Sequence, residues 1–143
     1  MSKPLQALDA ALEELLTVRF APLSPQVVLA AAEAWERVAA RVCAGRLVML
    51  AALGERDDVI PKARAGQGAV TFAQHVAGQS RAQARRAAQT ASLLSARGGD
   101  LPRTGTALAA GDISSEHAQV AVRAHQELGA AARDLLVPCE LAA

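Results

Sequence analysis

Apolar residues recur at three- and four-residue steps along most of this chain, and that spacing predicts helices rather than strands. The first such stretch runs from Pro4 to Arg19 and presents Leu5, Leu8, Leu12, Leu15 and Leu16. Pro22 ends it, and Ser24 followed by Pro25 is a typical helix start. The helix that opens there meets no further breaker until about Asp57, so one unusually long helix is expected.

The long helix carries a heptad-like seam, which is typical of paired helices. The seam consists of Val28, Ala31, Trp35, Val38, Val42, Gly45, Met49 and Ala52. It has two interpretations, packing within the same chain or a homodimer interface. Leu47, Val48 and Leu50 make another side of the helix apolar, which favours burial within the chain. Gly45 costs a helix interior about 1 kcal/mol relative to alanine, so a neighbouring helix is expected to approach closely there.

The second half of the chain predicts a linker followed by shorter helices. Residues 58–70 contain Pro61, Gly66 and Gly68 without apolar periodicity, as linkers do. Helices are then expected over residues 71–77, 80–96, 104–110 and 114–128. Ser80 and Ser114 are helix-capping residue types, and glycines follow the predicted ends. Segment 129–143 is weakly amphipathic and interrupted by Pro138. We expect it to be the truncated beginning of a segment that continues in a longer parent protein.

Composition agrees with an all-helical chain. Alanine supplies 35 of the 143 residues, tyrosine is absent, and the aromatic residues are limited to Phe20, Trp35 and Phe72. Few residues are therefore of the types that β-sheets favour. We predict a single all-α domain over residues 1–143, a multi-helix bundle with one long helix (within 4–57) and a helix-turn-helix-like segment over 71–128.

Charge is unevenly distributed although the net charge is only +1. Residues 61–105 carry seven basic side chains and one acidic one, while the segments on either side are net negative. A local excess of +6 is what a surface that binds a polyanion requires. The charge pattern therefore favours a nucleic acid partner over the alternative that these residues only form a solvated face.

The helix expected over 80–96 gathers the chemistry that could contact DNA. At 100° per residue, Ala84, Ala87, Ala88, Ala91 and Leu94 share one side, and the basic residues lie on the other. Arginine can bond guanine bidentately and also neutralise phosphate. The predicted DNA-contacting residues are Arg81, Arg85, Arg86 and Gln89, with Arg97 and Arg103 as weaker phosphate contacts.

The stretches QHVAGQSRAQARRAAQTASLL and LPRTGTALAAGDISSEHAQVAV resemble the domain-of-unknown-function family 222, the 13E12-repeat family of actinobacterial proteins. The resemblance extends from about Leu5 to Leu136 and is most specific at Leu101-Pro102, Ala107-Leu108, Gly111 and Ser114 to Ala118. The same segment is more distantly similar to the helix-turn-helix of ParB-type partition proteins. The family's helical domain usually precedes an HNH nuclease module, which implies a DNA-directed role. This chain has His75-Val76 where that family often has Trp-Leu.

Catalysis, cofactors and metal binding are not expected from this chain. The HNH module is missing, and the sequence after Ala118 holds one histidine, His125, and one cysteine, Cys139. His117 and His125 lie eight positions apart, which favours packing or capping roles over a metal clamp. Cys43 and Cys139 form no CxxC pair, so both are expected to be reduced thiols in a cytoplasmic protein. No small-molecule substrate is expected, and no 18-residue apolar run indicates a membrane span.

These patterns leave two hypotheses of different classes. The first is a DNA-binding, non-catalytic helical domain of an HNH-endonuclease-associated protein, with double-stranded DNA as its partner. The second is a helical interaction module that forms a homodimer or binds a protein through the long helix, without nucleic acid.

Overall fold

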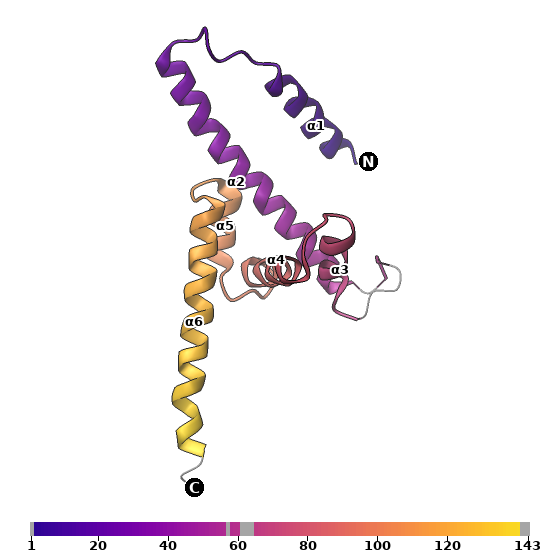
Figure 1. The fold of residues 1–143 in the computed structure, drawn as a ribbon, viewed down its shortest axis with the longest axis vertical. Coiled ribbons are helices and arrows are strands. Elements are labelled where there is room, and N and C mark those ends of the chain that lie inside the picture. The colour runs from indigo at the N-terminus through magenta and orange to yellow at the C-terminus, as the bar shows by residue number, and fades with distance from the viewer. Residues whose placement is uncertain (1, 57, 61–64, 141–143) are drawn as a thin grey trace. The chain divides into compact units, whose positions relative to one another are not determined.

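The computed structural model describes residues 2–56, 58–60 and 65–140, with the backbone alone over 133–140 (Figure 1). Within these residues the chain forms α-helices and no strands, so the predicted all-α class is confirmed. The long predicted helix is α2, which has 31 residues. The helices are α1 (Lys3–Leu16), α2 (Pro25–Glu55), α3 (Gly68–His75), α4 (Arg81–Leu94), α5 (Pro102–Ala110) and α6 (Ser115–Glu140).

The helix bounds differ from those predicted, mostly by one to three residues, and the differences at α3 and α6 bear on the fold. Helix α3 begins at Gly68, inside the expected linker, because Ala69 is buried against Leu50 and Ala91. Helix α6 does not end at Leu128 but continues to Glu140. Three alanines follow Gly129, and alanine is the residue that favours helix most. Asp57 and residues 61–64, which include Pro61 of the predicted linker, lie outside the described residues.

The chain forms two compact units, and the first ends at Trp35. It contains α1 and the beginning of α2. None of residues 2–35 is buried, and the leucine side of α1 is largely exposed, at 44% for Leu5 and 36% for Leu8. The amphipathic pattern of α1 therefore forms a helix without forming a core inside this unit.

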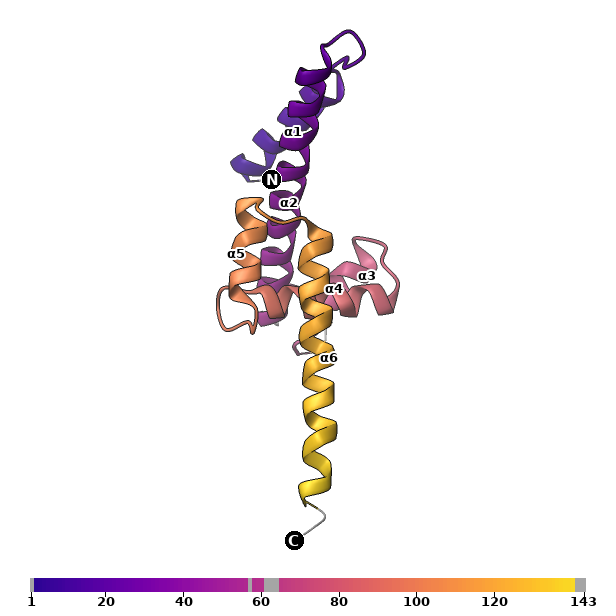
Figure 2. The same cartoon turned by 90° about the vertical axis from the view of Figure 1, so that its left-hand side faces the viewer.

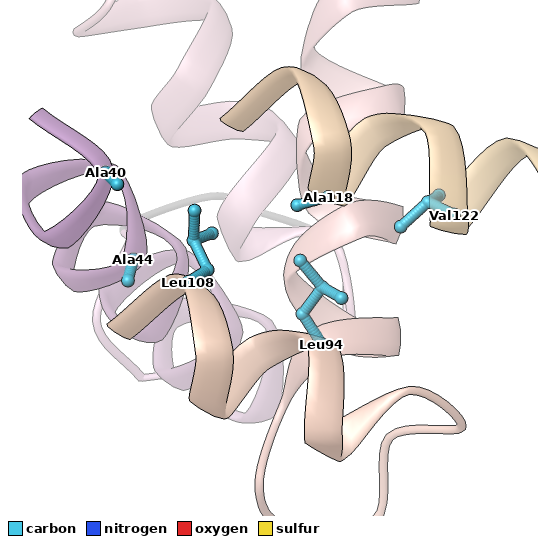
Figure 3. Close-up of a cluster of buried hydrophobic side chains, with 6 residues drawn as sticks. All are labelled: Ala40, Ala44, Leu94, Leu108, Ala118 and Val122. Carbon is cyan, nitrogen blue, oxygen red and sulfur yellow. The ribbon is translucent and has the colours of Figure 1, made fainter. Parts of the chain in front are cut away.

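The second unit begins at Glu36 and contains the buried core. Leu108 of α5 and Leu94 of α4 meet at its centre, where both side chains point inward (Figure 3). Small residues surround them from α2 and α6, namely Ala40, Ala44, Ala118 and Val122. The helices can approach closely because alanine occupies little volume. Both views show α6 continuing beyond the other helices of this unit (Figures 1 and 2).

A second cluster joins α2 to α3 and α4. Leu50 is 1% exposed and packs with Ala69 and Ala91, and Phe72 and Leu47 lie against them. Burying one leucine in this way contributes about 2 kcal/mol. Of the apolar side predicted from Leu47, Val48 and Leu50, Leu50 is buried and Leu47 is partly buried, while Val48 is 69% exposed. Leu47 and Leu50 fix α3 and α4 against the C-terminal half of α2.

The heptad-like seam of α2 does not pack within the second unit. Val38, Val42, Gly45, Met49 and Ala52 are all exposed, and Met49 keeps 52% of its surface accessible. The preferred interpretation, burial of the seam within the same chain, is therefore not met by the packing of the second unit. The reason is that the core takes the opposite side of the helix, the side that carries Ala40, Ala44 and Leu47.

Two glycines within helices have opposite surroundings. A Cβ atom at Gly105 of α5 would overlap the carbonyl oxygen of Leu94, so α4 and α5 touch through this glycine. A Cβ atom at Gly45 would meet nothing within 4 Å. The close helix approach predicted at Gly45 therefore does not occur within the second unit, where the close approach is at Gly105 instead.

Not one helix in the described part of the chain is long and apolar enough to span a bilayer.

We predict opposite effects for the same substitution at these two glycines. Gly105→Ala should destabilise the fold by about 1 to 3 kcal/mol, because the added methyl group overpacks the contact between α4 and α5. Gly45→Ala should stabilise it by about 1 kcal/mol, because alanine favours helix and the site is open. Urea unfolding in dilute solution measures both changes. Equal changes at the two positions would contradict the packing described here.

Cys43 provides a titratable probe of the second unit. Its side chain lies against the core, and burial raises the pKa of its thiol, with Arg46 lowering it and Glu116 raising it to smaller extents. Burying the neutral thiol contributes stability below the ordinary thiol pKa, and this contribution is lost as the pH rises through the raised pKa. The side chain of Cys139, the other predicted thiol, lies outside the described residues.

We predict that Cys43 reacts slowly with iodoacetamide in the folded protein, because the thiolate is the reactive form. In a Cys139→Ser variant, the midpoint of the rate against pH should lie higher for the folded protein than for the same protein in urea. Identical pH profiles in the two conditions would show that Cys43 is not buried.

Candidate nucleic-acid interface

Helices α3 and α4 are joined by a tight turn, as the sequence predicted. Gly78 has a φ of +63°, a left-handed conformation that glycine adopts without strain. The Gln79 N–H donates to the carbonyl of Ala73 at 3.0 Å, and the Val76 N–H donates to that of Phe72 at 2.8 Å. These bonds close the end of α3 and set the direction in which α4 begins. The element order helix, turn, helix is thus present over residues 68–94.

Ser80 caps α4 with a reciprocal pair of hydrogen bonds. The Gln83 N–H donates to Ser80 Oγ at 3.3 Å, and the Ser80 N–H donates to Gln83 Oε1 at 3.0 Å. This capping box satisfies two backbone N–H groups at the helix start. The cap therefore stabilises the first turn of α4, which carries Arg81.

The buried side of α4 is made of small residues. Ala84 and Ala91 are 0% and 1% exposed, and Ala73 of α3 is 0% exposed. Close packing on this side leaves the other side in solvent. The predicted contact residues of α4 all lie there and are all exposed: Arg81, Arg85, Arg86 and Gln89.

Two of these arginines share a shallow hollow with α3. Arg81 and Arg85 line it together with Val70 and the amide side chains of Gln67 and Gln74. Its volume is about 220 Å³. Guanidinium and amide N–H groups are the donors that bind phosphate oxygens. The structure therefore brings Arg81 and Arg85 together with two glutamines that the sequence reasoning did not select.

No acidic side chain neutralises this surface within the described residues. The ion pairs among the described residues join Arg56 to Asp58 at 2.7 Å and His125 to Asp100 at 3.2 Å. Neither involves an arginine of α4. A guanidinium without an internal carboxylate partner is available to an external anion.

Arg97 and Arg103 lie apart from the hollow. Arg97 follows the end of α4, where it lines a larger and mostly apolar hollow of about 450 Å³ between α2, α4 and α5. Arg103 is exposed in the first turn of α5. The length of α4, about 20 Å, separates Arg97 from the first turn of that helix. The structure therefore does not group these two residues with Arg81 and Arg85.

The histidines of α6 have local hydrogen-bond partners. The His117 N–H donates to Ser114 Oγ at 3.3 Å, and its Nδ1 lies 3.1 Å from the same oxygen, so both residues belong to the cap of α6. His125 Nε2 lies 3.2 Å from Asp100 Oδ2, which ties α6 to the loop before α5. In the part of the chain that the structure describes, no three His, Cys, Asp or Glu side chains gather as metal ligands would.

Gln67 and Gln74 are the residues of this surface that sequence reasoning missed. Their spacing of seven places them on the same side of α3, and the first helix of a helix-turn-helix lies beside the second. The spacing of these two glutamines was therefore the signal in the sequence that could have placed them beside α4. It was hidden because α3 was expected to begin only at Thr71, which left Gln67 in the linker.

Comparison with known proteins gives no match to any family model, curated protein or solved structure. The resemblance to family 222 therefore stays a prediction.

We predict that the capping box holds the first turn of the basic helix. Ser80→Ala should destabilise the protein by about 1 kcal/mol, because it leaves a backbone N–H of that turn without its acceptor. Ser80→Asp is the matched control, since aspartate caps helices equally well and should restore the stability. Hydrogen exchange at the Gln83 amide reports the same change locally. Unchanged exchange in Ser80→Ala would contradict this role.

Proposed function

We propose that this chain is a DNA-binding helical domain that binds double-stranded DNA through α4. The observation that supports it best is the exposed side of α4, which carries Arg81, Arg85, Arg86 and Gln89 without an acidic partner. Had these side chains been buried or paired with carboxylates, the proposal would have lost its basis. The local charge excess of +6 over residues 61–105 supports the same partner.

Helix α4 has the form that a recognition helix needs. The major groove of B-DNA is wide enough to admit one α-helix, and the second helix of a helix-turn-helix lies in it. Arginine bonds guanine O6 and N7 bidentately, and glutamine bonds adenine N6 and N7. Arg86 and Gln89 lie beyond the hollow on the exposed side of α4 and are the proposed base contacts.

Arg81 and Arg85 are better placed for the phosphate backbone. They share the hollow with Gln67 and Gln74, so donors from two helices converge there. The N-terminus of α4 adds the favourable end of its dipole. Phosphate contacts fix the position of the protein on the duplex without reading its sequence. Arg97 and Arg103 remain weaker phosphate contacts in this proposal.

The resemblance to family 222 supports a DNA-directed role, in association with an HNH endonuclease module. We assign no catalytic step to this chain, because a metal-assisted nuclease needs metal ligands and a general base, and the sequence offers no such set. The proposed domain binds DNA and leaves cleavage to another module.

The second hypothesis, an interaction module without nucleic acid, is favoured by a different observation. The exposed seam of α2 leaves Val38, Val42 and Met49 uncovered in the second unit, and such apolar patches often mark interfaces. The homodimer predicted through α2 is compatible with DNA binding, because the seam and the basic side of α4 belong to different helices.

We predict that Arg85→Ala/Arg86→Ala weakens binding to duplex DNA and flattens its salt dependence. For every phosphate that the variant no longer neutralises, the slope of log K against log salt should fall by about 0.9. Removing a base contact should instead cost about 1 to 3 kcal/mol on the preferred sequence. A gel-shift series across salt concentrations, with duplex and single-stranded probes, measures both effects.

The matched control is Arg19→Ala/Arg123→Ala, which removes two exposed arginines outside the candidate surface. This variant should bind DNA nearly as tightly as the parent. If both double variants bound equally well, α4 would not be the contact helix. If the parent bound no duplex at low salt, the proposal itself would be wrong.

A further inference from the structure

Helix α2 is apolar on two sides, and the second unit of the chain buries only one of them. Ala40, Ala44 and Leu47 pack into the core. The other apolar side, here called the outer face, is exposed and consists of Val42, Gly45, Val48, Met49 and Ala52. Val48 and Ala52 lie at its edge and also line the hollow beside α4 and α5. Val48 keeps 69% of its surface accessible. Helices of soluble proteins usually keep this second side polar, so the outer face requires an explanation.

We propose that the outer face pairs with the outer face of a second copy of this chain, with the two α2 helices antiparallel about a two-fold axis beside Val48. This inference deepens the α2 interaction hypothesis and does not depend on DNA binding. In a two-fold dimer the same residues meet from both copies. Val48 of one copy then meets Val48 of the other.

The sizes of the facing side chains are complementary in this register. Val42, Met49, Gly45 and Ala52 occupy the two seam positions of the heptad. The pairs of seam residues are centred at the level of residue 47, one position before Val48. Met49 then lies against Gly45 of the second copy, and Val42 against Ala52. A long, flexible side chain thus enters the space that a glycine leaves. Gly45 has no neighbour for a Cβ atom within its own chain, and this contact gives it a function.

The charges at the edge of the outer face favour a second copy of this chain as the partner, and they favour antiparallel pairing of the two helices. Arg41, Val48 and Glu55 follow one another at intervals of seven along one edge. Antiparallel pairing about Val48 brings Arg41 of each copy to Glu55 of the other, at two symmetric places. Both side chains are exposed, and neither forms an ion pair within the described residues, although Glu55 lines the same hollow as Arg97. Glu55 also ends α2, where the helix dipole disfavours a negative charge that an arginine would neutralise.

Arg46 lies on the other edge and distinguishes this arrangement from a parallel one. In the antiparallel pair the two copies of Arg46 face each other and weaken the dimer. In a parallel pair Arg41 would face Arg46, and neither would meet a carboxylate. The contact region from Arg41 to Glu55 is about 21 Å long. We therefore expect a weak dimer, with a dissociation constant on the order of 10 to 100 µM.

Reversing the charge at Arg41 and at Glu55 tests the proposed pairing. Arg41→Glu and Glu55→Arg should each weaken self-association at least about tenfold in sedimentation equilibrium, because two ion pairs per dimer become repulsive. Equimolar mixing of the two variants should restore a dimer, since each then meets an opposite charge. The double variant Arg41→Glu/Glu55→Arg should dimerise as the parent does. Neither position belongs to the proposed DNA contacts, so a gel shift separates failure of this inference from failure of that one.

Two further variants separate dimerisation from folding. Gly45→Gln should raise the unfolding midpoint in dilute solution, because glutamine favours helix and the site is open, yet abolish self-association by blocking Met49 of the second copy. Arg46→Gln should strengthen the dimer severalfold by removing the repulsion at the other edge.

Three outcomes would overturn the proposal. One is a parent chain that stays monomeric up to about 1 mM, a concentration well above the expected dissociation constant. Another is a dimer that Arg41→Glu and Glu55→Arg leave unchanged, which would place the interface elsewhere. The third is a dimer that Arg41→Gln strengthens, which would indicate parallel pairing.

Discussion

Alanine and glycine at the helix contacts set the distance between the helix backbones in the second unit. The contacts of α4 depend on Ala84 and Ala91, and α5 touches the backbone of α4 through Gly105. Leu50 and Leu108 can be fully buried only because the helices around them lie this close. A larger residue at any of these contacts would separate two helices and expose the leucines, so small side chains are the condition for the core.

Close packing on one side of a helix determines what the other side presents. Helix α4 buries alanines and thereby turns Arg81, Arg85 and Arg86 to solvent, where the capping box of Ser80 stabilises the first turn. Helix α2 buries Ala40 and Ala44 in the same way, and this leaves its heptad-like seam uncovered. One packing rule thus produces a basic surface on one helix and an apolar surface on another.

The two surfaces suit different partners and are compatible in one molecule. The arginines of α4 carry positive charge without internal carboxylates, as a surface for a polyanion must. The outer face of α2 is apolar with one acid and two arginines at its edges, as a helix-pairing surface would be. A dimer through α2 would present two copies of α4, and dimeric helix-turn-helix proteins bind DNA with two such helices. The two proposals therefore reinforce each other without depending on the same residues.

The sequence by itself determined the helices, since apolar spacing, Ser80 and the glycine at position 78 are local signals that act within a few residues. It also identified the exposed arginines of α4, because a helix with alanines on one side must present its long polar residues on the other. Only the tertiary structure decided which of the two apolar sides of α2 enters the core, because Val42 and Leu47 are equally apolar and local pattern cannot rank them. It likewise decided that α3 begins at Gly68 and that Gln67 and Gln74 lie beside Arg81, since contacts between separate helices depend on packing that no single segment encodes.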